Sequence, residues 1–394
     1  MRPVVLSLLP GLFFVSSLCL PESSAAEVRV ATFNISFNRR NAGDLTADLN
    51  NQDPQAIKVA RILRTVRPDV VLLNEFDYDA DAKSLDLFQR VYLQTEDLPG
   101  DTEPLLFPHT WTSTVNTGVS SGIDLDGNGE VSGPADCFGF GWFPGQYGMA
   151  VLSKYPIAAD EVRTFQNLLW SDMPNARRPI DPESKKPWHS DVAWNTLRLS
   201  SKSHWDVPID IDGKRLHLLA SHPTPPAFDG PEDRNGCRNA DEIRFWADYL
   251  SPEKSAWITD DHGNEGGLAP SAHFCIVGDL NADPNDGASQ AGSINSLLEH
   301  PLVNSDVTPT SAGAVEASAT QGKQNASHHG PAKYDTADFS DNVVGNLRVD
   351  YVLPSRTLAV TDCAVFWPAS DDPTSSLTDS SDHHLVWINV ELPE

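Results

Sequence analysis

Short runs of apolar and β-branched residues recur along the chain, and turn-forming residues flank them. Their length and their flanks favour buried strands over helices. The predicted strands lie at residues 28–33, 69–73, 149–152, 215–220, 274–277, 349–353 and 385–390. Helical periodicity is found in fewer segments, at 55–66, 239–250 and 289–298. Because strands outnumber helices, the pattern predicts two packed sheets with helices on their outer faces, an α/β sandwich.

Long connections separate the predicted elements, and they are rich in Gly, Pro, Ser and Asp. They lie at residues 100–147, 165–200, 224–272 and 303–345. None of them has enough apolar periodicity to form a core of its own, so we interpret them as insertions on one scaffold. The segment 307–330, rich in Ala, Ser, Thr and Gly, is expected to be the weakest-ordered part.

The first 26 residues have the layout of a cleaved signal peptide. An apolar run from Val4 to Leu20 follows a basic start, and small residues precede a cleavage point after Ala26. Pro10 and Gly11 interrupt the run, which is shorter than the ~20 residues that a membrane span needs. We therefore predict an exported protein, secreted or periplasmic, without stable membrane association, in which residues 27–394 form one domain.

Four cysteines remain after this cleavage: Cys137, Cys237, Cys275 and Cys363. An exported compartment permits disulfides, and four cysteines allow three pairings between which the sequence does not choose. Cys275 and Cys363 lie in apolar runs typical of buried strands, so buried thiols are an equal alternative. No CxxC spacing indicates a zinc site.

Polar residues stand at the ends of the predicted strands, where a rigid element hands over to a loop. Catalytic groups are often found at such positions, and these side chains could converge at one rim. The set comprises Asn34, Glu75, His222, Asp279, Asn281, Asp382 and His383, and it is joined by Asp350, which lies inside the predicted strand 349–353.

Six segments that contain these residues occur in an order that resembles the endonuclease/exonuclease/phosphatase superfamily, including its deoxyribonuclease I branch. They are Val30-Ala31-Thr32-Phe33-Asn34, Leu73-Asn74-Glu75, Ser221-His222-Pro223, Gly278-Asp279-Leu280-Asn281-Ala282-Asp283, Arg348-Val349-Asp350-Tyr351 and Ser381-Asp382-His383-His384. The resemblance extends from about Glu27 to the C-terminus. It implies a four-layered α/β/β/α sandwich of two packed mixed sheets and a metal-dependent hydrolase of phosphate esters.

The resemblance also implies a metal site. Glu75 is the expected main ligand of Mg²⁺ or Mn²⁺, with Asn34 beside it and Asp382 contributing from the last strand. Carboxylate and amide oxygens are the donors that such hard cations prefer. Asn34 is in addition a candidate for substrate binding.

The roles of the other residues follow from the same resemblance. His383 would contact the phosphate or act as a base, with Asp350 fixing its tautomer. Asp279 would activate the attacking water, and Asn281 would donate to a phosphate oxygen. His222 matches the second histidine of the deoxyribonuclease branch, where a glutamate supports it. The corresponding segment 145–149 has no carboxylate here, which puts a proton-donor role of His222 in doubt.

Two further features each have a functional interpretation and one without a functional role. Lys202 and His204 precede the strand at 215–220 and are candidate phosphate contacts; a solvated loop is the alternative. Asp124, Asp126 and Asn128 match the start of a calcium-binding loop, which would hold a structural Ca²⁺. The twelfth position is Ala135 instead of the usual closing carboxylate, although the next residue, Asp136, could substitute. A turn-rich acidic loop is the alternative.

The charge balance narrows the substrate class. The chain has 394 residues and a formal net charge of −27, which opposes tight binding of long nucleic acid. We therefore favour a small or exposed phosphate ester as substrate, with weakly bound nucleic acid and a deoxyribonuclease-like endonuclease as the alternative. A non-catalytic binding protein on the same fold is a second alternative. The oligomeric state is left open.

Overall fold

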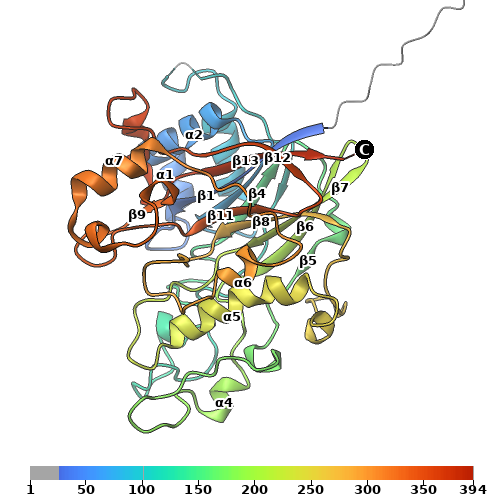
Figure 1. Ribbon diagram of the computed structural model, residues 1–394, viewed down its shortest axis with the longest axis vertical. Coiled ribbons are helices and arrows are strands. Elements are labelled where there is room, and N and C mark those ends of the chain that lie inside the picture. Colours follow the sequence, from blue (N-terminus) through green and yellow to red (C-terminus); the bar gives the residue numbers. More distant parts are fainter. Residues whose placement is uncertain (1–25, 101, 394) are drawn as a thin grey trace, which may run out of the picture.

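The computed structural model describes residues 26–100 and 102–393. The predicted signal peptide lies outside these described residues, apart from Ala26. Two sheets pack face to face, with α2 on the outer side of one and α5 on the outer side of the other (Figure 1). The predicted four-layered sandwich of two mixed sheets is therefore confirmed. Among residues 26–100 and 102–393, no helix has the length and hydrophobicity that a membrane crossing requires.

The first sheet has the strand order β12-β13-β1-β2-β4-β3. Its strands are β1 (Ala26–Phe37), β2 (Val70–Phe76), β3 (His109–Trp111), β4 (Met149–Ser153), β12 (Ala359–Val365) and β13 (Val386–Leu392). β1 runs parallel to β2 and antiparallel to β13. The first and last long strands of the chain are thus neighbours.

The second sheet has the order β11-β8-β7-β6-β5. Its strands are β5 (Arg163–Thr164), β6 (His204–Ile211), β7 (Lys214–Ser221), β8 (His273–Asp279) and β11 (Asp350–Pro354). β7 and β8 are parallel, whereas β11 is antiparallel to β8. A separate ribbon pairs β9 (Ala337–Asp338) with β10 (Asn346–Leu347).

The helices agree with the prediction in part. They are α1 (Asp44–Asn50), α2 (Pro54–Val66), α3 (Lys83–Leu87), α4 (Asp191–Trp194), α5 (Arg234–Tyr249), α6 (Asn295–Leu298) and α7 (Ala312–Gln321). α2 begins where Asp53 accepts two backbone N–H groups, a standard N-cap. α5 starts earlier than predicted, and α6 covers only the end of its segment. α7 lies inside 307–330, where weak order was expected; the Ser311 side chain caps it.

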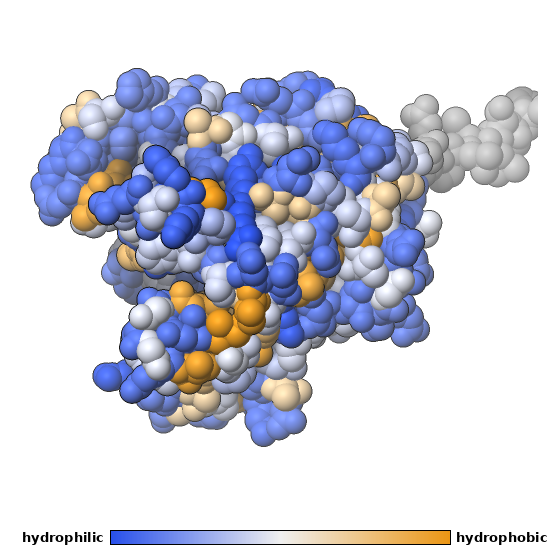
Figure 2. Space-filling model, turned by 90° about the horizontal axis from the view of Figure 1, so that it is seen from below, coloured by the Kyte–Doolittle hydropathy of each residue, from blue (hydrophilic) through white to orange (hydrophobic). Residues whose placement is uncertain are grey.

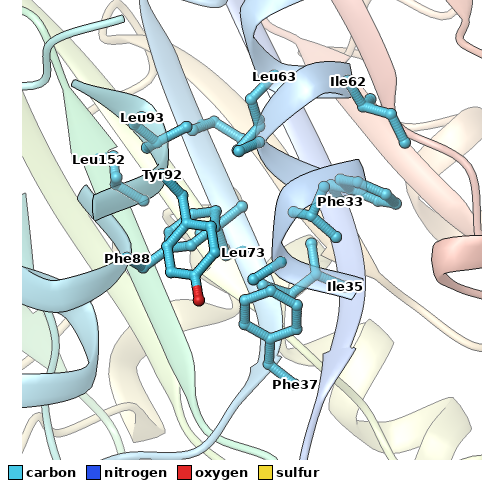
Figure 3. Close-up of a cluster of buried hydrophobic side chains, with 14 of the residues drawn as sticks. Phe33, Ile35, Phe37, Ile62, Leu63, Leu73, Phe88, Tyr92, Leu93 and Leu152 are labelled. Carbon is cyan, nitrogen blue, oxygen red and sulfur yellow. The ribbon is translucent and has the colours of Figure 1, made fainter. Parts of the chain in front are cut away.

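Alternation of side chains along the strands divides the interior into layers. On β1, Val28 and Val30 point into the core between the sheets, whereas Phe33 and Ile35 point outward, into the core beneath α2. Figure 3 shows this outer cluster, in which Leu63 of α2 lies over the strands. Strands buried on both faces read as continuous apolar runs, which is why the sequence pattern identified them.

The strand directions determine where the site forms. β1 is parallel to β2, and β7 is parallel to β8. Both pairs end at one edge of the sandwich, as hydrogen bonds from Asn34 to Asp279 and from Asn74 to the carbonyl of Ser221 show. β11 begins at the same edge: Asp350, its first residue, lies directly opposite Asp279, the last residue of β8. The polar residues that follow or begin these strands are thereby gathered from distant parts of the sequence.

The four cysteines within the described residues carry free thiols. None of the three possible disulfide pairings is therefore formed in this structure. Cys275 is buried in β8, as the apolar run predicts, and burial raises the pKa of its thiol. Cys363 is only partly buried, because β12 is an edge strand with an exposed face.

Candidate functional site

One carboxylate oxygen, Oδ2 of Asp279, is the meeting point of the predicted site. The amide nitrogen of Asn34 donates to it at 3.1 Å. Nε2 of His222 approaches it at 3.4 Å and Nε2 of His383 at 3.6 Å. Four residues predicted from separate motifs are thus brought together around one atom, and each is 5% exposed or less.

The backbone around Asp279 fixes this carboxylate. Its N–H donates to Oδ1 of Asn74, a buried side chain at the end of β2, at 3.3 Å. Its own Oδ1 accepts the N–H of Asn281 at 3.0 Å. Asn281 has a positive φ of 52° and donates one amide N–H to the carbonyl of Pro223. The amide of Asn281 has a second N–H, which the predicted contact with a phosphate oxygen would use.

Asp350 and His383 form a buried pair next to Asp279. Oδ2 of Asp350 lies 2.9 Å from Nδ1 of His383, so the ring presents Nε2 to the centre of the site. Burial alone would lower the pKa of His383, but the charges of Asp350 and Asp279 outweigh burial and raise this pKa well above its ordinary value. The ring is therefore cationic at neutral pH.

The pKa of Asp279 is raised to about 7. Burial is the main cause, and the charges of Asp350 and Glu75 add to it, whereas His383 and the hydrogen bond from Asn34 oppose it. A carboxylate that titrates near neutral pH can take up and release a proton under working conditions. This is the property that activation of a water molecule requires.

His222 is held differently from His383. Burial, followed by the charges of Lys202 and His383, lowers the pKa of His222 well below its ordinary value, so the ring is neutral. Within the described residues, its Nδ1 has no hydrogen-bond partner. The segment 145–149 supplies none: the Gln146 side chain donates to the carbonyl of Arg39. The doubt that the sequence raised about a proton-donor role therefore stands.

The predicted metal ligands Glu75 and Asp382 lie beside the last residues of β1 and the residue that follows it. Glu75 is half-buried and accepts from the Asn38 side chain at 2.6 Å. Asp382 is exposed and lies 3.5 Å from the Ser36 hydroxyl. Glu75, Asp279, Asp350 and Asp382 together place four carboxylates at this edge. The donor set, carboxylate and amide oxygens in a region of excess negative charge, fits a divalent hard cation.

The structure places Lys202 near the site and His204 away from it. Lys202 is buried near the site: burial lowers its pKa, and the charges of Glu242, Glu75 and Asp279 oppose this shift. His204 is not at the site, and the prediction that it contacts phosphate is wrong in this structure. Its ring lies in the core, 3.0 Å from the Ser200 hydroxyl and 2.9 Å from the carbonyl of Glu242.

Three carboxylates of the acidic loop near residue 124 lie close together. One oxygen from each of Asp124, Asp126 and Asp136 lies within 4.8 Å of the others. The Asn128 amide donates to Asp126 at 3.1 Å. These carboxylates also accept backbone N–H groups of their own loop. Binding of Ca²⁺ by this loop stays a prediction.

Sequence reasoning missed Glu242, which is buried in α5. Its two carboxylate oxygens accept the N–H of Ser201 and the N–H of Thr224, each at 2.6 Å. It thereby ties together the loop that carries Lys202 and the loop that follows His222. A glutamate among the apolar residues of a helix signals a buried charge that needs partners, but the sequence does not show which groups those partners are.

Asp335, which is buried beside the site, allows a prediction about how the stability of the fold depends on pH. Burial, together with the charges of Asp283 and Asp286, raises the pKa of Asp335 to about 8. An aspartate in an unfolded chain titrates near ~3.9. Between these values the folded state holds a proton that the unfolded state has lost, so this group makes stability fall as pH rises.

We expect Asp335→Asn, which cannot ionise, to be more stable than the original protein, with an advantage that grows from about pH 5 to about pH 8.5. Urea unfolding at both pH values measures it. Asp160→Asn, at an exposed position, is the control and should leave the pH dependence unchanged. An advantage of equal size at both pH values would contradict the assignment.

Comparison with known proteins identifies the family of this chain. The model of the Endonuclease/Exonuclease/phosphatase family matches residues 31–383. A comparison with curated proteins found no similar sequence. Among solved structures, the chain is similar to an endonuclease/exonuclease/phosphatase from Beutenbergia cavernae (17% identity, 93% of this chain, 72% of that chain, TM-score 0.48). It is also similar to sphingomyelinase C from Streptomyces griseocarneus (14% identity, 92% of this chain, 99% of that chain, TM-score 0.46).

Proposed function

The chain belongs to the endonuclease/exonuclease/phosphatase family, and from this premise we propose that it is an exported hydrolase of small or exposed phosphate esters. Its class of activity, metal-dependent hydrolysis of phosphate esters, follows from the family. The observation that carries the proposal is the convergence of Asn34, His222 and His383 on Oδ2 of Asp279.

In this mechanism, Glu75 would be the main metal ligand, and Asn34 and Asp382 would supply the other protein ligands. A bound Mg²⁺ or Mn²⁺ would neutralise negative charge on the phosphate oxygens. The protein supplies little positive charge of its own near the centre, apart from His383 and Lys202. The cation thus reconciles a net charge of −27 with a substrate that is itself an anion.

The chain's own residues divide the proton and positioning work. Asp279 orients the attacking water and accepts its proton, for which a pKa of about 7 is suited. His383, cationic and oriented by Asp350, donates from Nε2 to a phosphate oxygen. Lys202 and the second N–H of Asn281 add donors to the phosphate. As the water oxygen bonds to phosphorus, the P–O bond to the leaving group breaks, and the leaving oxygen takes its proton from solvent. His222 remains neutral, with Nε2 facing Oδ2 of Asp279.

Two properties of the surface support a small or exposed ester over long nucleic acid. The net charge of −27 opposes a run of contacts to successive phosphates. Large apolar side chains are also exposed on loops, among them Phe140, Trp142 and Phe228. Figure 2 shows hydrophobic residues gathered on one part of the face seen from below, with hydrophilic residues around them. Such surfaces suit an organic group better than a phosphate backbone.

A substrate panel tests the proposal. Plasmid DNA, RNA, bis(p-nitrophenyl) phosphate and p-nitrophenyl phosphate are compared with Mg²⁺, with Mn²⁺ and with EDTA. We expect metal-dependent hydrolysis of a nitrophenyl ester at a higher kcat/KM than cleavage of plasmid. A preference for plasmid would favour the endonuclease alternative. No hydrolysis of any substrate under any condition would favour the non-catalytic binding protein.

Export is tested separately. Expression of the full chain with its first 26 residues in a bacterial host should give a mature protein that begins at Glu27, which N-terminal sequencing of the periplasmic or culture fraction detects. Recovery of the uncleaved chain in the cytoplasm would overturn this part of the proposal.

A further inference from the structure

We infer that the hydroxyl of Thr336 positions the Asp350–His383 pair for catalysis, an inference that rests on the proposed function. Thr336 lies directly before β9, in the 303–345 connection, and is 2% exposed. Its Oγ1 donates to Oδ2 of Asp350 at 2.8 Å. The same Oγ1 accepts the N–H groups of Val349 and Asp350, both at 3.0 Å.

The hydrogen bonds of the Thr336 hydroxyl favour donation to Asp350. A threonine hydroxyl has one proton and two lone pairs. The two backbone N–H groups occupy the lone pairs. The single proton then has two acceptors, Oδ2 of Asp350 at 2.8 Å and the carbonyl of Leu347 at 3.5 Å, and the shorter bond to Asp350 is the stronger one.

The hydroxyl acts on the same carboxylate oxygen that His383 uses. Oδ2 of Asp350 faces both the Thr336 hydroxyl and Nδ1 of His383, at 2.8 and 2.9 Å. Within the described part of the chain, the other oxygen, Oδ1, has no hydrogen-bond partner. Thr336 is thus the group that keeps Oδ2, and not Oδ1, turned toward the imidazole. If the Asp350 carboxylate rotated, the hydrogen bond that sets the tautomer and the orientation of the His383 ring would be lost.

Two backbone hydrogen bonds hold Thr336 in place. Its N–H donates to the carbonyl of Leu347 at 2.8 Å, and its carbonyl accepts the N–H of His384 at 2.8 Å. Three residues later, the ring of Phe339 packs edge-to-face on His383, with ring centroids 5.3 Å apart. The 303–345 connection therefore contacts both Asp350, through Thr336, and His383, through Phe339.

The test compares Thr336→Val, which removes the hydroxyl at nearly constant size, with Thr336→Ser, which keeps it. Thr336→Ala removes the same hydroxyl with less bulk, and serves if the valine variant does not fold. Steady-state kinetics use the nitrophenyl ester that the panel identifies. In parallel, NMR of protein with ¹⁵N-labelled histidine follows the Nδ1–H resonance of His383, which Asp350→Asn identifies by its loss. This signal requires no substrate.

We expect Thr336→Val to lower kcat by about 10–100-fold while KM stays within about twofold, and to weaken the Nδ1–H signal. Thr336→Ser should restore both. Ser355→Ala is the matched control, because Ser355 is also a buried hydroxyl that accepts a backbone N–H, beyond the far end of β11. An unchanged signal and kcat in folded Thr336→Val would overturn the inference. If no substrate is hydrolysed, the proposed function fails, whereas the NMR signal still decides the role of Thr336.

Discussion

Replacing Asp279 with asparagine lowers kcat by about 10²–10⁴-fold and leaves the fold intact, because the amide keeps the shape of the carboxylate but cannot take up a proton. The original enzyme should gain activity as pH rises through about 7, where Asp279 becomes ionised. The residual activity of Asp279→Asn should lack this rise. The measurements are kcat over a pH series and thermal unfolding of both proteins.

A comparable loss is expected for His383→Ala, since both residues face the same reacting centre. The double variant should have nearly the same kcat as either single variant, because the effects of mutating residues that act as one unit are not additive. Asp206→Asn is the control: this carboxylate is also buried and hydrogen-bonded to a histidine, His217, but its partners lie away from the site. Near-original activity in either Asp279→Asn or His383→Ala would refute the assignment.

The sequence was informative about this centre because strand ends carry its residues. Asp279 stands at the junction of an apolar run with a polar segment. Asp350 was expected inside a strand and is the first residue of β11, where the antiparallel register with β8 places it opposite Asp279. β8 ends and β11 begins at the same edge of the sheet, so their polar terminal residues meet there. The pattern of buried runs therefore predicted both the sandwich and the convergence of the site.

Other elements escaped prediction for identifiable physical reasons. β6 alternates polar and apolar residues and includes Pro208, so its sequence lacks the continuous apolar run of a central strand. The apolar run around Cys363 does form a strand, β12, but this is an edge strand with an exposed face and not the buried strand that the run indicated. His204 looked like a surface histidine because the sequence does not show that Phe245 and Trp246 of α5 pack against its ring.

The supporting residues of the site were the hardest to predict. Thr336 and Glu242 act by hydrogen bonds to groups far away in the sequence, and a threonine in a Gly- and Ser-rich connection has no local signature of such a role. The pattern could identify residues that perform chemistry by their type and position. It could not identify residues whose function is a long-range contact, because that contact exists only after the chain has folded.

Replacing Glu75 with glutamine raises the Mn²⁺ or Mg²⁺ concentration for half-maximal activity by about 10–100-fold, and EDTA abolishes the activity of the original protein. Glu75 is the expected main ligand and has a positive φ of 59°, a backbone conformation uncommon for a glutamate. Glutamine keeps the size of the side chain and the hydrogen bond from Asn38, but removes the negative charge that attracts the cation.

Two measurements separate metal binding from general damage. Calorimetric titration with Mn²⁺ should show the weaker affinity directly, in the absence of substrate, and excess Mn²⁺ should recover much of the lost rate. Asp124→Asn, in the separate acidic loop, should leave the metal dependence of the rate unchanged. If Glu75→Gln reaches half-maximal activity at the original metal concentration, the ion is held elsewhere. The cluster of Asp279, Asp350 and His383 would then be the first place to look.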